Sequence, residues 1–98
     1  MLIEKTIENG KAVFALDGRL DTLTSPDLDK ALEALPEEAN ELVMDFSKLT
    51  YVSSAGLRVL LRAHKKMMPK GGFKICGVND TIQEIFDVTG FSEILTIE

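Results

Sequence analysis

Strand-forming and helix-forming segments alternate along this sequence, and this alternation constrains the fold more than any other feature. Strand patterns are predicted at residues 2–8, 11–17, 42–46, 73–78 and 93–97. Helical patterns are predicted at residues 25–35 and 53–68, and between Asn79 and Gly90. Buried strands that alternate with helices pair in parallel through right-handed crossovers. The sequence therefore predicts an α/β sandwich, with helices packed on a mixed β-sheet in the order β-β-α-β-α-β-α-β.

Turn and cap residues set the expected ends of these elements. Asn9-Gly10 suits a two-residue hairpin turn, so the first two strands are expected to be antiparallel. Gly18 is expected to end the second strand, which leaves residues 18–24 as a loop. Ser25-Pro26 is typical of a helix start, with Ser25 as the N-cap. Residues 48–52 are expected to connect the third strand to the next helix.

Size, charge and cysteine content narrow the class of protein. The 98 residues suit one domain spanning residues 1–98, and the net charge of −5 argues against nucleic acid as a partner. The N-terminal residues lack a signal-peptide pattern, and no apolar run has the length of a membrane span, so we expect a cytoplasmic protein without a membrane partner. Cys76 is the only cysteine, which excludes an internal disulfide and a cysteine-based zinc site. It is expected to be a small core residue.

The residues needed for catalysis do not come together in the sequence. His64 is the only histidine and follows Ser54 by ten residues on the same predicted helix. That separation is about 15 Å along a helix axis, too far for His64 to activate the serine hydroxyl. Neither glycine motif that binds nucleotide phosphates is present. The sequence predicts no enzyme, no metal site and no cofactor.

Two adjacent serines, Ser53 and Ser54, stand where a loop becomes a helix, and two interpretations remain open. One hydroxyl is an N-cap, or one is presented to a kinase, since a helix N-terminus tolerates a phosphate well. Arg58 lies four residues after Ser54, within reach of a phosphate there. It either helps hold the phosphate or belongs to a solvated basic face with Arg62, Lys65 and Lys66.

Three segments, taken together and in order, resemble the anti-sigma factor antagonists of the STAS domain family. The segments are LDGRLD followed by SPDL (residues 16–21 and 25–28), LVMDFS followed by SSAGL (residues 42–47 and 53–57), and IQEIFDVTGF (residues 82–91). The resemblance covers nearly the whole chain. It implies a STAS-type sandwich and a non-enzymatic bacterial regulator of transcription that works by partner switching.

The resemblance also implies partners and site residues. An unphosphorylated antagonist binds an anti-sigma factor, which is also an ATP-dependent serine kinase, and so frees a sigma factor. Phosphorylation ends the complex, and a serine phosphatase restores it. The family's acceptor serine corresponds to Ser54, with Ser53 as the alternative, and its loop aspartate corresponds to Asp21. The partner-binding residues are predicted to be Asp21, Thr22, Ser25, Ser53, Ala55, Gly56 and Arg58.

This sequence departs from the common family pattern on both sides of Ser54. Many members have aspartate where this chain has Ser53, and serine or threonine where it has Ala55. An alternative function within the family is therefore a STAS scaffold module that is not phosphorylated and serves a stress-signalling or transport assembly. Binding to an ATP-dependent kinase would separate the two.

Overall fold

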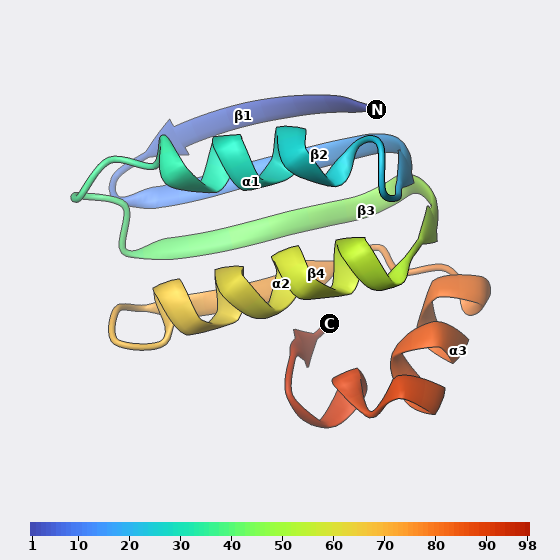
Figure 1. The fold of residues 1–98 in the computed structure, drawn as a ribbon. Helices are drawn as coiled ribbons and strands as arrows, with labels where there is room; N and C mark the ends of the chain where they lie inside the picture. The colour runs from blue at the N-terminus through green and yellow to red at the C-terminus, as the bar shows by residue number, and fades with distance from the viewer.

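The computed structural model describes residues 1–98 and contains one five-stranded mixed sheet (Figure 1). The strands are β1 (Leu2–Glu8), β2 (Lys11–Leu20), β3 (Glu41–Val52), β4 (Gly72–Cys76) and β5 (Thr96–Ile97). They lie in sequence order, with β1 antiparallel to β2 and every other neighbouring pair parallel. The helices are α1 (Ser25–Glu33), α2 (Ser54–Met67) and α3 (Asp80–Thr89), and a short 3-10 helix η1 (Phe91–Glu93) follows α3. The predicted fold class and element order are confirmed.

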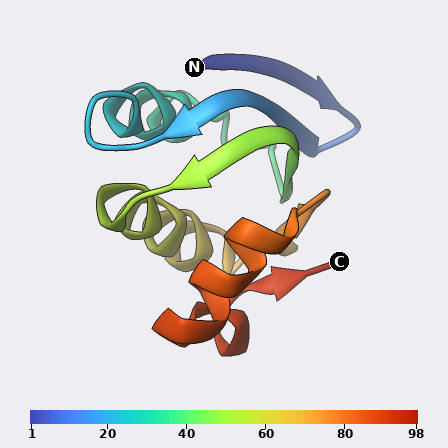
Figure 2. The same ribbon diagram turned by 90° about the vertical axis from the view of Figure 1, so that its right-hand side faces the viewer.

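One face of the sheet carries the helices and the core. Helices α1 and α2 lie side by side across this face, and α3 lies beside α2, toward the β5 side of the sheet (Figures 1 and 2). Inward-pointing residues of β2, such as Phe14 and Leu16, join Leu28 of α1 and Leu60 of α2 in one continuous buried cluster. Alternate strand residues, such as Val13, point to the opposite face and are half-buried. No helix has the length and apolar composition needed to cross a membrane.

Strands β2 and β3 are longer than the sequence pattern predicted. Gly18 does not end β2, because its φ of 115° accommodates a local irregularity in the pairing with β3. The hydroxyl of Thr50 donates a hydrogen bond to the Gly18 carbonyl at 3.0 Å, and the pairing continues as far as Leu20 and Val52. The expected connection at residues 48–52 was therefore wrong, and so was the expected loop at residues 18–20, because these two segments pair with each other. Residues 21–24 do form a loop, as predicted.

The three helices begin at or within one residue of their predicted starts, but the N-cap of α1 is not the predicted residue. Thr24 stands at the N-cap position of α1, and Ser25 lies in the first turn with 6% of its surface exposed. The predicted Ser25 cap was wrong because the Asp21 carbonyl already accepts the Ser25 N–H at 2.8 Å. At α3, the Asn79 side chain accepts from the Ile82 N–H and so caps the helix, and Gly90 ends it with φ of 80°.

Cys76 is not a core residue. It follows buried Ile75 on β4, so its side chain points to the face without helices and is half-buried there. Partial burial raises the pKa of the Cys76 thiol above its ordinary value, and the nearby carboxylates of Asp45 and Glu98 add to this effect. The predicted core position was therefore wrong, because alternate residues of a strand point to opposite faces and it is Ile75 that points into the core.

Candidate functional site

The ends of β2 and β3 bring the predicted site residues together. Leu20 and Val52 are paired at the carboxyl ends of these parallel strands, and each strand runs directly into a connection to a helix. The Ser53 N–H donates to the Leu20 carbonyl at 2.9 Å, which ties the two connections to each other. Figure 2 looks onto this end of the sheet and shows the β2–α1 and β3–α2 connections side by side. We call this region the carboxyl edge, comprising residues 19–24 and 51–58.

Gly56 joins the first turn of α2 to the end of β2. A Cβ atom at this position would lie 2.8 Å from Leu20 Cγ and 2.9 Å from the Leu20 carbonyl oxygen. Real Cβ atoms essentially never come that close, so only glycine fits without a shift of the backbone. Gly56 is buried and is not itself part of the exposed surface. It allows α2 to begin directly beside the loop that contains Asp21.

The two serines have different roles at the start of α2. Ser53 is the N-cap, half-buried, and its hydroxyl oxygen accepts from the Gly56 N–H at 3.3 Å. Ser54 is the first residue of α2, is exposed, and its hydroxyl makes no hydrogen bond within the chain. The first turn of a helix also offers unpaired N–H groups and a positive field. Of the two serines, the one with a free hydroxyl is therefore Ser54.

The Asp21 carboxylate is occupied by its own loop. Its Oδ1 accepts hydrogen bonds from the N–H groups of Leu23 at 3.0 Å and Thr24 at 3.1 Å. The Thr24 hydroxyl in turn accepts from the Asp21 N–H at 2.9 Å and donates to the Arg19 carbonyl at 2.7 Å. Desolvation acts to raise the pKa of Asp21, but the hydrogen bonds from Thr24, Leu23 and Arg19 outweigh it and leave the pKa below its ordinary value. The structure thus places Asp21 at the carboxyl edge as an ordering group of this loop.

Two further side chains at the carboxyl edge had no role in the sequence analysis. The Arg19 guanidinium lies over the Tyr51 ring, 4.5 Å from its centroid, and its Nε lies 3.6 Å from Asp21 Oδ2. These contacts connect β2, β3 and the Asp21 loop. The spacing of Asp21 and Thr24 is typical of a side-chain-stabilised turn and could have revealed this loop from sequence. Nothing in the sequence marks the cross-strand contact of Arg19 with Tyr51.

The remaining predicted residues divide into exposed and internal positions. Thr22 and Arg58 are exposed and Ala55 is half-buried, whereas Ser25 is buried within the first turn of α1. The Arg58 guanidinium has no hydrogen bond or ion pair within the chain, although it lies one turn after Ser54. The exposed part of the predicted site is therefore Thr22, Ser54 and Arg58, with Ala55 partly accessible.

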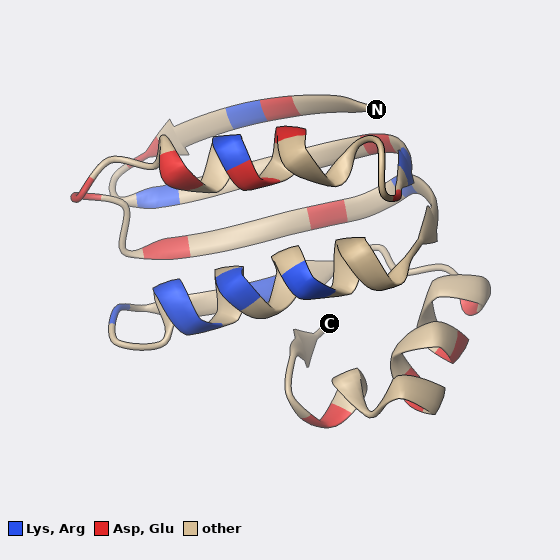
Figure 3. Cartoon of the chain, in the orientation of Figure 1, with Lys and Arg blue, Asp and Glu red and all other residues tan.

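The basic face of α2 is only partly solvated; it consists of Arg58, Arg62, Lys65 and Lys66. Figure 3 shows its Lys and Arg residues along one side of α2, next to acidic residues of α1. Arg62 makes a two-bond ion pair with Asp29, at 2.9 and 3.0 Å, and Lys66 donates to the Leu32 carbonyl at 2.8 Å. These two residues join α2 to α1. Arg58 and Lys65 make no such contact and remain available to another molecule.

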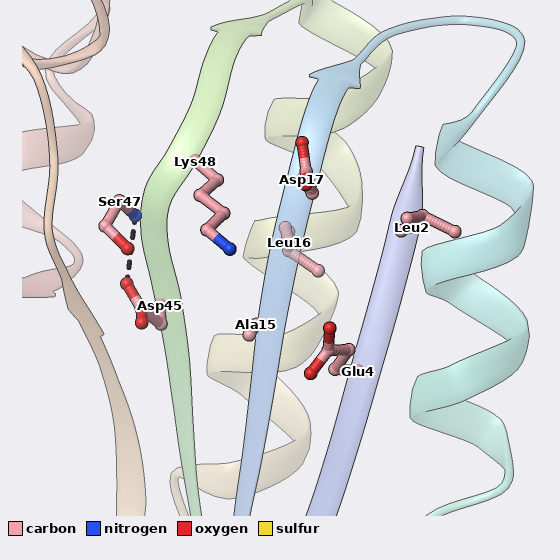
Figure 4. A pocket seen from close by; sticks show the side chains of 8 residues that line it. All are labelled: Leu2, Glu4, Ala15, Leu16, Asp17, Asp45, Ser47 and Lys48. Carbon is pink, nitrogen blue, oxygen red and sulfur yellow. Dashed lines mark hydrogen bonds between the residues drawn. The ribbon is translucent and has the colours of Figure 1, made fainter.

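A pocket on the helix-free face of the sheet has no catalytic arrangement. It is lined by acidic groups that include Glu4, Asp17 and Asp45, together with Lys48 (Figure 4). Asp45 Oδ1 accepts from the Ser47 N–H at 2.9 Å, which lowers the pKa of Asp45. No group of three or more His, Cys, Asp or Glu side chains converges as a metal site.

Comparisons with known proteins agree on one family. The STAS domain model matches residues 3–98. The anti-sigma-B factor antagonist of Listeria monocytogenes is 30% identical over 83 residues, which are 83% of this chain and 73% of that protein. The anti-sigma F factor antagonist of Paenibacillus polymyxa is 29% identical over 100 residues, covering 97% of this chain and 84% of that protein. A crystal structure of an anti-sigma factor antagonist from Mycobacterium paratuberculosis superposes with a TM-score of 0.86 at 23% sequence identity, covering 98% of this chain and 83% of that one.

Proposed function

This chain belongs to the STAS domain family and to the anti-sigma factor antagonists within it, and we propose that its unphosphorylated form binds an anti-sigma factor and so frees a sigma factor. Anti-sigma factor antagonists are non-enzymatic regulatory proteins of bacteria. In the proposed cycle the anti-sigma factor is also a serine kinase that uses ATP to phosphorylate Ser54. A serine phosphatase then restores the binding form, and all these steps take place in the cytoplasm.

The exposure of Ser54 is the observation that carries this proposal. Its hydroxyl is free, whereas the neighbouring Ser53 hydroxyl caps α2. A kinase needs an accessible hydroxyl, and a residue without internal contacts can be modified without loss of fold stability. These two conditions favour Ser54 over Ser53 as the phosphate acceptor.

A phosphate at Ser54 would act on the partner and leave the fold intact. A phosphoserine carries about −1.5 to −2 charges at pH 7, and the positive end of a helix favours such a charge by about 0.3–1 kcal/mol. In a complex, the same charge would lose water without gaining a partner on the other protein. Weakening a complex 100- to 1,000-fold requires about 3–4 kcal/mol, which the desolvation of a buried dianion can supply.

Arg58 is positioned to interact with that phosphate. It is exposed, has no internal partner, and stands one helical turn after Ser54. A nearby guanidinium stabilises the dianion, so it lowers the second pKa of the phosphate. Phosphorus NMR of the phosphorylated protein should show that pKa rising in Arg58→Gln. Lys65→Gln is the matched control, because Lys65 is an unpaired cation farther along α2, and its pKa curve should follow the wild type.

Mass spectrometry of the protein isolated from its own organism tests the acceptor. The tryptic peptide of residues 49–58 contains both serines, and fragmentation assigns the phosphate to one of them. We expect it on Ser54. A phosphate on Ser53 would keep the mechanism and correct the residue. Absence of phosphate under every growth condition would favour the unphosphorylated scaffold role.

Affinity capture tests the switch itself. Immobilised wild type and Ser54→Ala should retain a serine kinase from the lysate, and Ser54→Asp should lose it. The Ser54→Asp variant should have the same thermal unfolding midpoint as the wild type. If Ser54→Asp binds the kinase as well as wild type does, or if it fails to fold, the proposed mechanism is wrong.

A further inference from the structure

Leu23 is the most exposed large apolar side chain of the molecule, with 88% of its surface accessible. It lies in the β2–α1 connection, three residues after Leu20, whose carbonyl is hydrogen-bonded to Ser53 and whose side chain packs on Gly56. Leu23 therefore belongs to the carboxyl edge, on the β2–α1 connection, which lies beside the β3–α2 connection (Figure 2). A single exposed leucine is common on protein surfaces, so exposure alone assigns it no role.

Leu23 differs from other exposed leucines because hydrogen bonds hold the loop around it in a fixed conformation. The backbone N–H of Leu23 and that of Thr24 both donate to Asp21 Oδ1, and the Thr24 hydroxyl bridges the Asp21 N–H and the Arg19 carbonyl. The Asp21 carbonyl accepts from the Ser25 N–H at 2.8 Å, which fixes the loop to the start of α1. The Leu23 backbone is thus held in place before any partner arrives.

The Asp21 side chain, in contrast to that of Leu23, is largely covered and already makes contacts within its own loop. Only 27% of its surface is exposed, Oδ1 is used by the loop, and Oδ2 faces Arg19 at 3.6 Å. A partner that approaches this connection would meet the Leu23 side chain first and would find the carboxylate already engaged. The residue that contacts the partner and the residue that orders the loop are therefore different.

We propose that Leu23 is the apolar residue with which this chain contacts its anti-sigma factor, and that Asp21 is a positioning residue that holds Leu23 in place. The identity of the partner rests on the function proposed above. An apolar side chain on a preordered loop is buried at little cost in conformational entropy, so most of its desolvation contributes to affinity. A phosphate on the adjacent helix start would have to lose water for this apolar contact to be buried. The position of Leu23 thereby gives a physical reason why phosphorylation of Ser54 ends the complex.

The first test replaces the contact residue. Leu23→Ser should keep the wild-type unfolding midpoint and weaken binding to the captured serine kinase by about tenfold to a hundredfold, measured by titration calorimetry. Met68→Ser is the matched control, because Met68 is also exposed, at 60%, but follows the far end of α2. Its affinity should stay within about twofold of the wild type.

The second test separates positioning from contact at Asp21. Asp21→Asn keeps an oxygen that can accept from Leu23 and Thr24, so it should bind within about threefold of the wild type. Asp21→Ala removes that acceptor, so it should weaken binding by about tenfold or more and speed hydrogen exchange of the Leu23 and Thr24 amides. In the Leu23→Ser background, Asp21→Ala should add little further loss, because it acts through the same contact.

Each possible result supports or contradicts the assignment. Wild-type affinity in Leu23→Ser would overturn the role of Leu23, even if Ser54→Asp still abolishes binding and the proposed function stands. A large loss in Asp21→Asn would show that the carboxylate charge itself contacts the partner. Loss of self-association in Leu23→Ser, with kinase binding unchanged, would assign the residue to contact with a second copy. If the wild type binds no serine kinase at all, the proposed function fails and the assigned partner fails with it.

Discussion

Replacing Gly56 with alanine tests the contact that sets α2 against the end of β2. The new Cβ would lie 2.8 Å from Leu20 Cγ, 3.1 Å from Leu20 Cδ2 and 2.9 Å from the Leu20 carbonyl oxygen. The Leu20 side chain is fully buried, and its carbonyl is hydrogen-bonded to the Ser53 N–H at 2.9 Å. Neither group can move away without disturbing the core or this hydrogen bond. The substitution therefore acts where the first turn of α2 packs on the end of β2.

Two opposing effects decide the magnitude. Alanine has the higher helix propensity, which alone would stabilise α2 by about 1 kcal/mol. Overpacking costs about 1–3 kcal/mol, and weakening the hydrogen bond between Ser53 and Leu20 costs about 0.5–1.5 kcal/mol more. We expect the free energy of unfolding to fall by about 1–3 kcal/mol. For a domain of this size, each kcal/mol lowers the unfolding midpoint by about 4–8 °C.

Urea denaturation followed by circular dichroism gives the free energy of unfolding. Ser54→Ala is the control, because it changes an exposed side chain in the same turn, and it should stay within about 0.5 kcal/mol of the wild type. Leu20→Ala removes part of the crowding, so the double variant should be less destabilised than the sum of the single variants by about 1 kcal/mol. A Gly56→Ala protein as stable as the wild type would refute the argument that this contact requires glycine.

Two further predictions concern stability elsewhere in the fold. Asn79→Ala should lower the free energy of unfolding by about 1–3 kcal/mol in urea titrations. It removes both the side-chain cap at the Ile82 N–H and the hydrogen bond to the Leu49 carbonyl. Asn79→Asp keeps the cap, so its free energy of unfolding should fall by about half as much. Hydrogen bonding from Ser47 sets the pKa of Asp45 below its ordinary 3.8, so this carboxylate stabilises the fold above that pH and the contribution is lost as pH falls through the lower native pKa. Asp45→Asn should therefore be destabilised relative to the wild type at about pH 5 and less so at about pH 3, and an equal difference at both would contradict it.

Local signals predicted the elements of this fold better than their ends. Asn9-Gly10 has positive φ values at both residues, as a two-residue hairpin turn requires, and the Asn79 cap depends on atoms only three residues away. Such signals are complete within a short stretch of sequence. The extension of β3 to Val52 is different, because it depends on pairing with Leu20, 32 residues earlier. No local pattern in residues 48–52 shows that a partner strand is available.

The same distinction applies to the candidate site. The resemblance to a known family located Asp21, Ser54 and their neighbours, but it did not show how each side chain is used. Ser25 is buried and Gly56 packs on Leu20, because the first turns of both helices press against the strand ends. These are contacts between segments far apart in the sequence. The hydrogen bonds that engage Asp21 are local, whereas the exposure of Leu23 is visible only in the folded loop.

The substitution of Ser53 for the aspartate common in this family has a physical explanation in the structure. Aspartate and serine are nearly equal as N-caps, and Ser53 accepts from the Gly56 N–H as an aspartate would. The cap, the packing of Gly56 and the free hydroxyl of Ser54 thus fall on three separate residues of one turn. A charge added at Ser54 changes neither the cap nor the packing. Because stability and surface chemistry are separated in this way, the proposed phosphorylation of Ser54 would alter partner binding without a cost to the fold.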